Sequence, residues 1–106
     1  MGILNAGDGT LDRIIRQNRV VLVDFWAPWC MPCRMQSPIL DRLAEEEGDG
    51  VVIAKVNVDE NPLLAARHRI RGIPTLKLFV GGLETASMTG VQSLGRLKEL
   101  VSRYAS

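Results

Sequence analysis

The chain has 106 residues, of which 46% are apolar and 24% are charged. That length suits a single domain spanning residues 1–106, and the apolar share is enough to fill a core. Its 13 basic and 12 acidic residues leave a formal net charge of +1, so a nucleic-acid or membrane-binding surface is not expected. No secretory signal and no bilayer-spanning apolar run is recognisable. We therefore expect a cytoplasmic protein that binds neither nucleic acid nor membrane.

The predicted elements of the first half alternate between helix and strand. A helix begins at Leu11, with Thr10 or Asp8 as a candidate N-cap. Residues 20–26 are nearly continuous apolar and rich in β-branched side chains, which is typical of a strand covered on both faces. A longer helix is expected over residues 32–47, because apolar residues recur along one of its faces.

The second half continues the alternation and contains a hairpin. Strands are predicted over residues 51–58, 75–80 and 83–88, and the Gly81-Gly82 pair fits the tight turn between the last two. Gly48 is placed to end the helix expected over residues 32–47 in the left-handed conformation. Asn61-Pro62 predicts the start of a helix that runs to about Arg69, and a last helix is expected after Ser93.

This order of elements predicts an α/β sandwich. Strands that are joined through helices should be parallel, and the hairpin strands should be antiparallel. Residues 3–5 could add a short strand at one edge, which the sequence leaves open.

The two cysteines of the chain, Cys30 and Cys33, lie two residues apart at the predicted junction between a strand and a helix. Free backbone N–H groups and the positive end of the helix dipole favour a thiolate there, so we expect a lowered pKa for Cys30. Two inert core cysteines are the plain alternative. A structural zinc site normally needs four ligands, and only His68 and scattered carboxylates could complete one. The placement favours a redox pair.

Four motifs follow one another along the chain. They are Val23-Asp24-Phe25-Trp26-Ala27-Pro28-Trp29-Cys30-Met31-Pro32-Cys33, then Ala54-Lys55-Val56-Asn57-Val58-Asp59-Glu60-Asn61-Pro62, then Ile70-Arg71-Gly72-Ile73-Pro74-Thr75-Leu76, and finally Gly90. In this order they resemble the motifs of the thioredoxin family. The resemblance covers the chain from about residue 10 to its end. It implies the thioredoxin fold, an α/β fold with a central mixed sheet of four to five strands flanked by about four helices.

The resemblance also implies a thiol–disulfide oxidoreductase that reduces protein disulfides. Cys30 matches the attacking cysteine and Cys33 the resolving one, and together they form the redox-active disulfide. No bound cofactor or metal is implied, and the electrons would come from NADPH through a thioredoxin reductase. Implied partners are that reductase and disulfide-containing target proteins, with the chain acting as a monomer in electron transport and cell redox homeostasis.

Two charged residues in predicted strands have possible catalytic roles. Asp24 interrupts an apolar strand, so burial should raise its pKa, unless it marks a strand end that reaches water. The resemblance makes Asp24 the proton acceptor that helps to deprotonate Cys33, and it pairs Lys55 with Asp24 across neighbouring strands. Without it, Lys55 would be an ordinary solvent-facing lysine.

The residues around the dithiol have possible substrate-binding roles. The resemblance predicts a cis bond before Pro74, which leaves backbone groups of Ile73 free to pair with an extended substrate. Trp29 is expected to be exposed beside Cys30 and to dock protein surfaces, although a partly packed aromatic is the alternative. The expected substrate-binding residues are Trp29, Met31, Pro32, Ile73, Pro74 and Gly90.

Two other functions use the same residues. An oxidant or isomerase would have a less stable disulfide, and Met31, which stands where most family members have glycine, could alter that stability. A binding module would use the surface around Trp29 and Pro74 with incidental redox chemistry. A Cys–His hydrolase is not favoured, since His68 lies between two arginines in a predicted helix.

Overall fold

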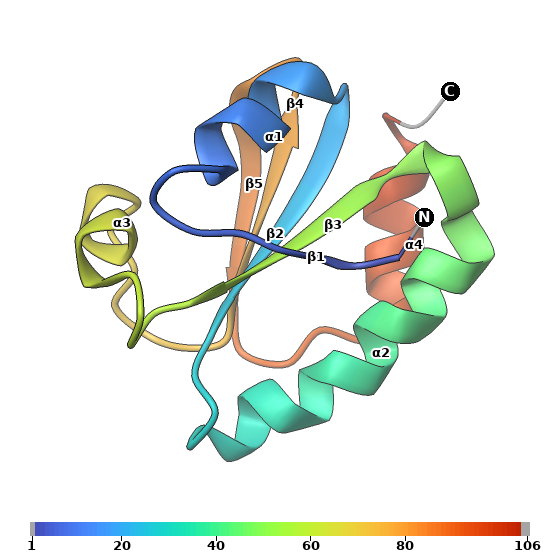
Figure 1. Cartoon of the computed structure of the whole chain (residues 1–106). Helices are drawn as coiled ribbons and strands as arrows, with labels where there is room; N and C mark the ends of the chain where they lie inside the picture. The colour runs from blue at the N-terminus through green and yellow to red at the C-terminus, as the bar shows by residue number, and fades with distance from the viewer. Residues whose placement is uncertain (1, 105–106) are drawn as a thin grey trace.

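The computed structural model describes residues 2–104. Its centre is a five-stranded sheet in the order β1-β3-β2-β4-β5 (Figure 1). The strands are β1 (Leu4–Asn5), β2 (Val20–Trp26), β3 (Val52–Asn57), β4 (Thr75–Val80) and β5 (Leu83–Thr89). β1, β3 and β2 run parallel, whereas β4 is antiparallel to both β2 and β5. The mixed sheet expected from the sequence is therefore confirmed, and residues 4 and 5 do form an edge strand.

Helices cover both faces of this sheet. They are α1 (Leu11–Gln17), α2 (Met31–Glu47), α3 (Pro62–Arg67) and α4 (Leu94–Ser102). In Figure 1, α2 and α4 lie on one side of the sheet and α1 and α3 on the other. Within residues 2–104, no helix combines the length and apolar character needed to cross a bilayer.

The alternation of side chains along β2 builds two cores. Val20 and Leu22 pack with Leu40, Leu43 and Leu97 under α2 and α4. Val21, Val23 and Phe25 point to the other face and pack with Leu11, Ile15 and Leu64 under α1 and α3. Because side chains of a strand alternate between faces, Asp24 lies on the face that α2 covers.

The glycines predicted to end α2 and to form the hairpin turn adopt positive φ angles. Gly81 and Gly82 have φ angles of 59° and 86°, as the turn requires. Gly48 ends α2 with a φ of 54°, but its ψ of −122° differs from the predicted left-handed helical conformation. Glycine adopts this region without the steric cost of a Cβ. Ser93 caps α4, because its side chain accepts a hydrogen bond from the backbone N–H of Arg96.

Three local features differ from what the sequence predicts. α3 ends at Arg67 rather than near Arg69, because Arg69 itself adopts a left-handed φ of 58° that stops the helix. A short 3₁₀ helix at Gly48–Gly50 was not predicted. Thr10 is the N-cap residue of α1, but its hydroxyl accepts from the backbone N–H of Gly7 instead of from the helix.

Candidate active site

The two cysteines meet where β2 passes into α2. Cys30 is the N-cap of α2, and it forms a disulfide with Cys33, one turn into the helix. The backbone N–H of Cys33 donates to Cys30 Sγ at 3.2 Å. Cys30 is 5% exposed and Cys33 2% exposed, so the sulfur of the N-cap residue belongs to the more accessible cysteine. A thiolate at Cys30 would therefore face the unpaired N–H groups and the positive dipole of the helix.

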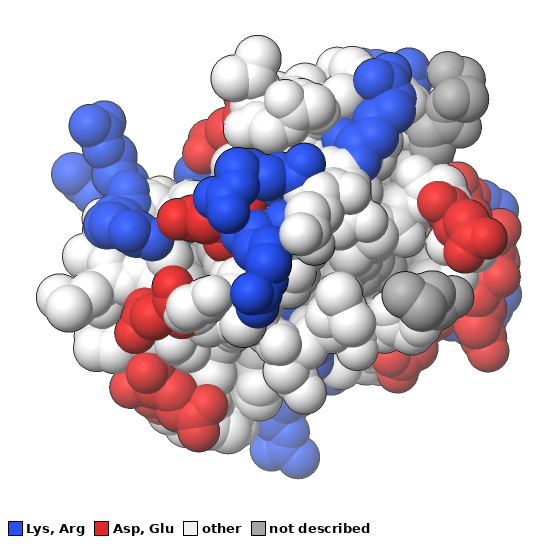
Figure 2. Space-filling view, turned by 45° about the horizontal axis from the view of Figure 1, so that its top comes forward, with Lys and Arg blue, Asp and Glu red and all other residues white. Residues whose placement is uncertain are grey.

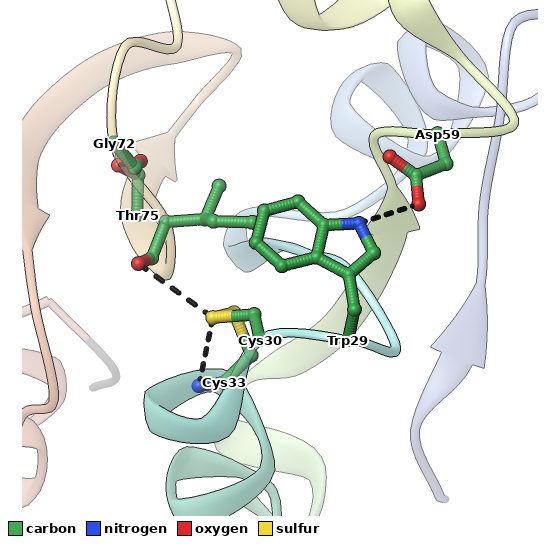
Figure 3. The surroundings of a disulfide bond; sticks show 7 residues. Trp29, Cys30, Cys33, Asp59, Gly72 and Thr75 are labelled. Atoms are coloured by element: carbon green, nitrogen blue, oxygen red, sulfur yellow. Dashed lines mark hydrogen bonds between the residues drawn. A yellow bond between two sulfur atoms is a disulfide. The ribbon is translucent and has the colours of Figure 1, made fainter.

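The loop before β4 faces the disulfide. The peptide bond between Ile73 and Pro74 is cis, which confirms the sequence-based prediction. The carbonyl oxygen of Ile73 lies 3.7 Å from Cys30 Sγ. Gly90 closes this side of the site, since its N–H donates to the carbonyl oxygen of Pro74 at 2.8 Å. Figure 3 shows Gly72 and Thr75, which flank the cis bond, across from the two cysteines.

Trp29 lies on the surface beside the disulfide. Its side chain is 70% exposed, as expected, and its indole Nε1–H donates to Asp59 Oδ2 at 2.8 Å (Figure 3). Met31 and Pro32 are also exposed. Exposed apolar side chains thus lie next to Cys30 along the chain, and the hydrogen bond to Asp59 orients the largest of them, Trp29.

Asp24 is a buried carboxylic acid under α2. Its side chain is 0% exposed, and within residues 2–104 neither carboxyl oxygen has a hydrogen-bond partner. Burial raises the pKa of Asp24 from 3.8 to about 7, and the positive charge of Lys55 opposes that rise. The carboxyl group can therefore gain or lose a proton near neutral pH.

The expected direct pairing of Lys55 with Asp24 is not found. The two residues are register partners of β3 and β2, but their side chains form no ion pair among the described residues. Lys55 Nζ donates instead to Ser37 Oγ of α2 at 3.0 Å, and it lies 4.7 Å from the ring centroid of Trp26. The hydroxyl and the aromatic face hold the ammonium group, so Lys55 acts on Asp24 only through its field.

His68 packs on the face of the sheet that α1 and α3 cover, away from the two cysteines. Its ring packs at 5.4 Å from the ring of Phe25 and at 5.9 Å from that of Phe79. Desolvation, followed by the positive charges of Lys77 and Arg67, lowers the pKa of His68. Among the described residues, no group of three or more His, Cys, Asp or Glu could hold a metal ion.

Charged side chains of both signs lie close together on the face that Figure 2 shows. Five ion pairs join residues of the described range, among them Arg67 with Asp12 and Lys98 with Glu46. Mixed charge of this kind produces no extended field of one sign.

Three residues near the site were missed by sequence reasoning. Asp59 holds Trp29, Ser37 holds Lys55, and Gln36 binds the backbone of Gln92. Of these, Gln36 alone has a signal in the sequence, because it is a polar residue on the otherwise apolar face of α2. The partners of all three lie at least 18 positions away along the chain.

The arrangement is suited to thiol–disulfide exchange. It contains one sulfur at a helix N-terminus in the less buried of the two cysteines, a second sulfur one turn away, and a buried acid that titrates near neutrality. Beside them lie the backbone carbonyl of Ile73 and exposed apolar side chains that another polypeptide could contact.

Comparisons with known proteins agree with this chemistry. The thioredoxin family model matches residues 3–103. A thioredoxin from Pyropia yezoensis is 44% identical over 93 residues, which cover 88% of this chain and 87% of that one. A thioredoxin from Alicyclobacillus acidocaldarius is 45% identical over 91 residues, which cover 86% of this chain and 87% of that one.

Two solved structures are also similar to this chain. A mutant thioredoxin from Halobacterium salinarum superposes with a TM-score of 0.91 at 40% identity, covering 99% of this chain and 92% of that one. A second similar chain has a TM-score of 0.87 at 27% identity, covering 95% of this chain and 94% of that one. It comes from a study of thiol resolution in a yeast mitochondrial peroxiredoxin by the glutathione and thioredoxin systems.

Proposed function

The chain belongs to the thioredoxin family and is a thiol–disulfide oxidoreductase, and from this premise we propose that it reduces the disulfides of other proteins. The observation that carries the proposal is the Cys30–Cys33 pair at the N-terminus of α2 beside an exposed apolar surface. Neither incidental redox activity in a binding module nor an oxidant or isomerase is favoured by the comparisons.

In the first proposed step, the Cys30 thiolate attacks one sulfur of a target disulfide. A new S–S bond forms between Cys30 and the target, the target disulfide breaks, and its other sulfur leaves as a thiolate that takes up a proton. The N–H of Cys33, already 3.2 Å from Cys30 Sγ, supports the attacking thiolate.

In the second step, Cys33 loses its proton and attacks the sulfur of Cys30. The mixed disulfide breaks, the target leaves with both cysteines reduced, and the chain keeps the Cys30–Cys33 disulfide. Two electrons have then passed to the target. We assign the proton of Cys33 to Asp24, whose pKa of about 7 suits that transfer. Lys55, held by Ser37, keeps that pKa from rising further.

The target is proposed to lie across the apolar surface around Cys30. Its extended backbone would pair with Ile73, whose carbonyl oxygen already lies near Cys30 Sγ. This target-binding surface comprises Trp29, Met31, Pro32, Ile73, Gly90 and Val91, together with Pro74, which is itself buried in the structure.

The remaining features of the cycle are proposed from the resemblance to the family. The disulfide would be reduced again by a thioredoxin reductase with electrons from NADPH, with the chain acting as a monomer. The cytoplasm is the expected location, because such a cycle needs a reducing compartment. Peroxiredoxins are one candidate class of target, since a similar chain appears in a study of peroxiredoxin resolution.

Reduction of insulin with NADPH and a thioredoxin reductase tests the proposal. The wild-type chain should turn over, Cys30→Ser should be inactive, and Cys33→Ser should stop at a mixed disulfide with the target. The reduction potential, measured against a glutathione buffer, tests the direction. A value well below that of the glutathione pool supports a reductant, whereas a value at or above it would make the chain an oxidant or isomerase.

A further inference from the structure

Gln36 is a buried amide on the inner face of α2. It lies one helical turn after Cys33, and its side chain is 0% exposed. The other buried residues of this helix are Cys33, Leu40 and Leu43, so an apolar side chain would be the ordinary choice at this position. A buried amide is costly unless its donor and acceptor both find partners.

Both groups of the Gln36 amide bind the backbone of Gln92. Gln36 Oε1 accepts from the N–H of Gln92 at 2.7 Å, and Gln36 Nε2 donates to its carbonyl oxygen at 3.0 Å. The side chain of Gln92 in turn donates from Nε2 to the carbonyl oxygen of Gly90 at 3.0 Å. Gln36 therefore satisfies both the N–H and the carbonyl oxygen of Gln92, as a neighbouring β-strand would. The side chain of Gln92 in turn links this contact to Gly90.

The segment held in this way forms one edge of the target-binding surface. Residues 90–93 connect β5 to α4, and they leave the end of the sheet at which β2 passes into α2 (Figure 1). Gly90 donates to Pro74 at 2.8 Å on one side, while Val91 is exposed. The segment is thus fastened to the cis-proline loop by Gly90 and to the active-site helix by Gln36.

We propose that Gln36 is a positioning residue for target proteins. It holds Gly90 and Val91 at a fixed distance from the dithiol and so raises the affinity for a folded target without contacting the reacting sulfurs. A short irregular segment that loses its backbone partners becomes mobile, and a target must then order it on binding. The inference rests on the proposed function, since it assumes that targets lie across this surface.

Gln36→Met is the direct test, because methionine has a similar length and is apolar but makes neither hydrogen bond. Gln17→Met, at an exposed position of α1 at the opposite end of the sheet, is the matched control. Each pre-reduced protein is mixed with insulin at increasing concentrations, and separately with a dipyridyl disulfide, which is too small to span the surface. Tryptophan fluorescence follows the single turnover.

With Gln36→Met, the insulin concentration at half-maximal rate should rise about fivefold, while the maximal rate changes less than about twofold. The rate with the dipyridyl disulfide should stay within about twofold of wild type. Gln92→Ala removes only the bond to Gly90 and should have a smaller effect in the same direction. Amide exchange of the Gln92 N–H should become about tenfold faster in Gln36→Met, because its acceptor is gone.

Each other outcome has a definite meaning. If wild type reduces insulin and Gln36→Met has the same half-saturating concentration, the inference is wrong although the proposed function stands. Equal slowing with both disulfides would place Gln36 in the sulfur chemistry and also overturn it. Failure of wild type to reduce insulin would refute the proposed function instead. Should Gln36→Met not fold, Gln36→Leu, which matches the buried Leu40 and Leu43 of the same helix face, also removes both hydrogen bonds, and an unchanged half-saturating concentration would refute the inference.

Discussion

Replacing Asp24 by asparagine should remove the part of the pH dependence of folding stability that this buried carboxyl group causes. The carboxyl group is fully buried without a hydrogen-bond partner among residues 2–104, and burial raises its pKa from 3.8 to about 7. At about 1.4 kcal/mol for each factor of ten in the dissociation constant, keeping Asp24 ionised in the fold costs about 4 kcal/mol. Above the folded-state pKa the protein bears this whole cost.

The sign follows from the protons that each state binds. Between pH 3.8 and about 7 the folded state holds a proton on Asp24 that the unfolded state has lost. The free energy of unfolding therefore falls as the pH rises through this window, and the loss is complete above it. An amide in place of the carboxyl group binds no such proton in either state. The Asp24→Asn variant should therefore gain on wild type by about 2.5 kcal/mol between about pH 5 and pH 8.

Urea unfolding of the oxidised proteins at these two pH values measures the effect. Asp41→Asn, at an exposed position of α2, is the matched control for removing one carboxylate. A stability difference between Asp24→Asn and wild type that is the same at both pH values would refute the reasoning, because Asp24 would then titrate alike in both states. The same variant should slow disulfide exchange at neutral pH, since Cys33 loses its proton acceptor.

Three further predictions concern residues outside the dithiol. Arg69→Gly should raise the free energy of unfolding by about 0.5 to 1 kcal/mol in urea, because glycine adopts the φ of 58° without steric cost; a loss of stability would contradict this. Glu84→Ala should cost about 2 kcal/mol, because Lys77, with a side chain only 9% exposed, loses its 3.0 Å ion pair. The double variant with Lys77→Leu should recover most of that loss, and simple additivity would show that the pair is uncoupled. For His68, whose pKa is lowered in the fold, protonation favours the unfolded chain, so its contribution to stability falls as the pH drops below 6.5. Thermal melts of His68→Phe across that range should lack this component, and an NMR titration that gives an ordinary pKa would remove its basis.

The secondary structure was largely predictable because its signals are local. β2 and β4 have the predicted bounds, since continuous apolar, β-branched runs of this length suit buried strands. Gly48, Gly81 and Gly82 mark positions that require positive φ. The end of α3 was not predictable, because Arg69 adopts a left-handed conformation that its residue type disfavours.

The dithiol was predictable from the sequence for a similar reason. A helix N-terminus supplies its N–H groups and dipole to whatever residue stands there, so the position of Cys30 already indicates its chemistry. The spacing to Cys33 then places both sulfurs on one turn, and the structure joins them in a disulfide. The family resemblance added the cis-proline, which the structure contains, and the proposed direction of the reaction.

The chain by itself therefore determined the alternation of strands and helices, the turn glycines and the redox pair. The tertiary structure decided which side chains meet across long separations. Lys55 hydrogen-bonds to Ser37 rather than pairing with Asp24, and Trp29 hydrogen-bonds to Asp59. Gln36 hydrogen-bonds to a residue 56 positions away. Such contacts depend on how a helix packs over a sheet and on which donor fits the space beneath it, and no pattern of neighbouring residues records that geometry.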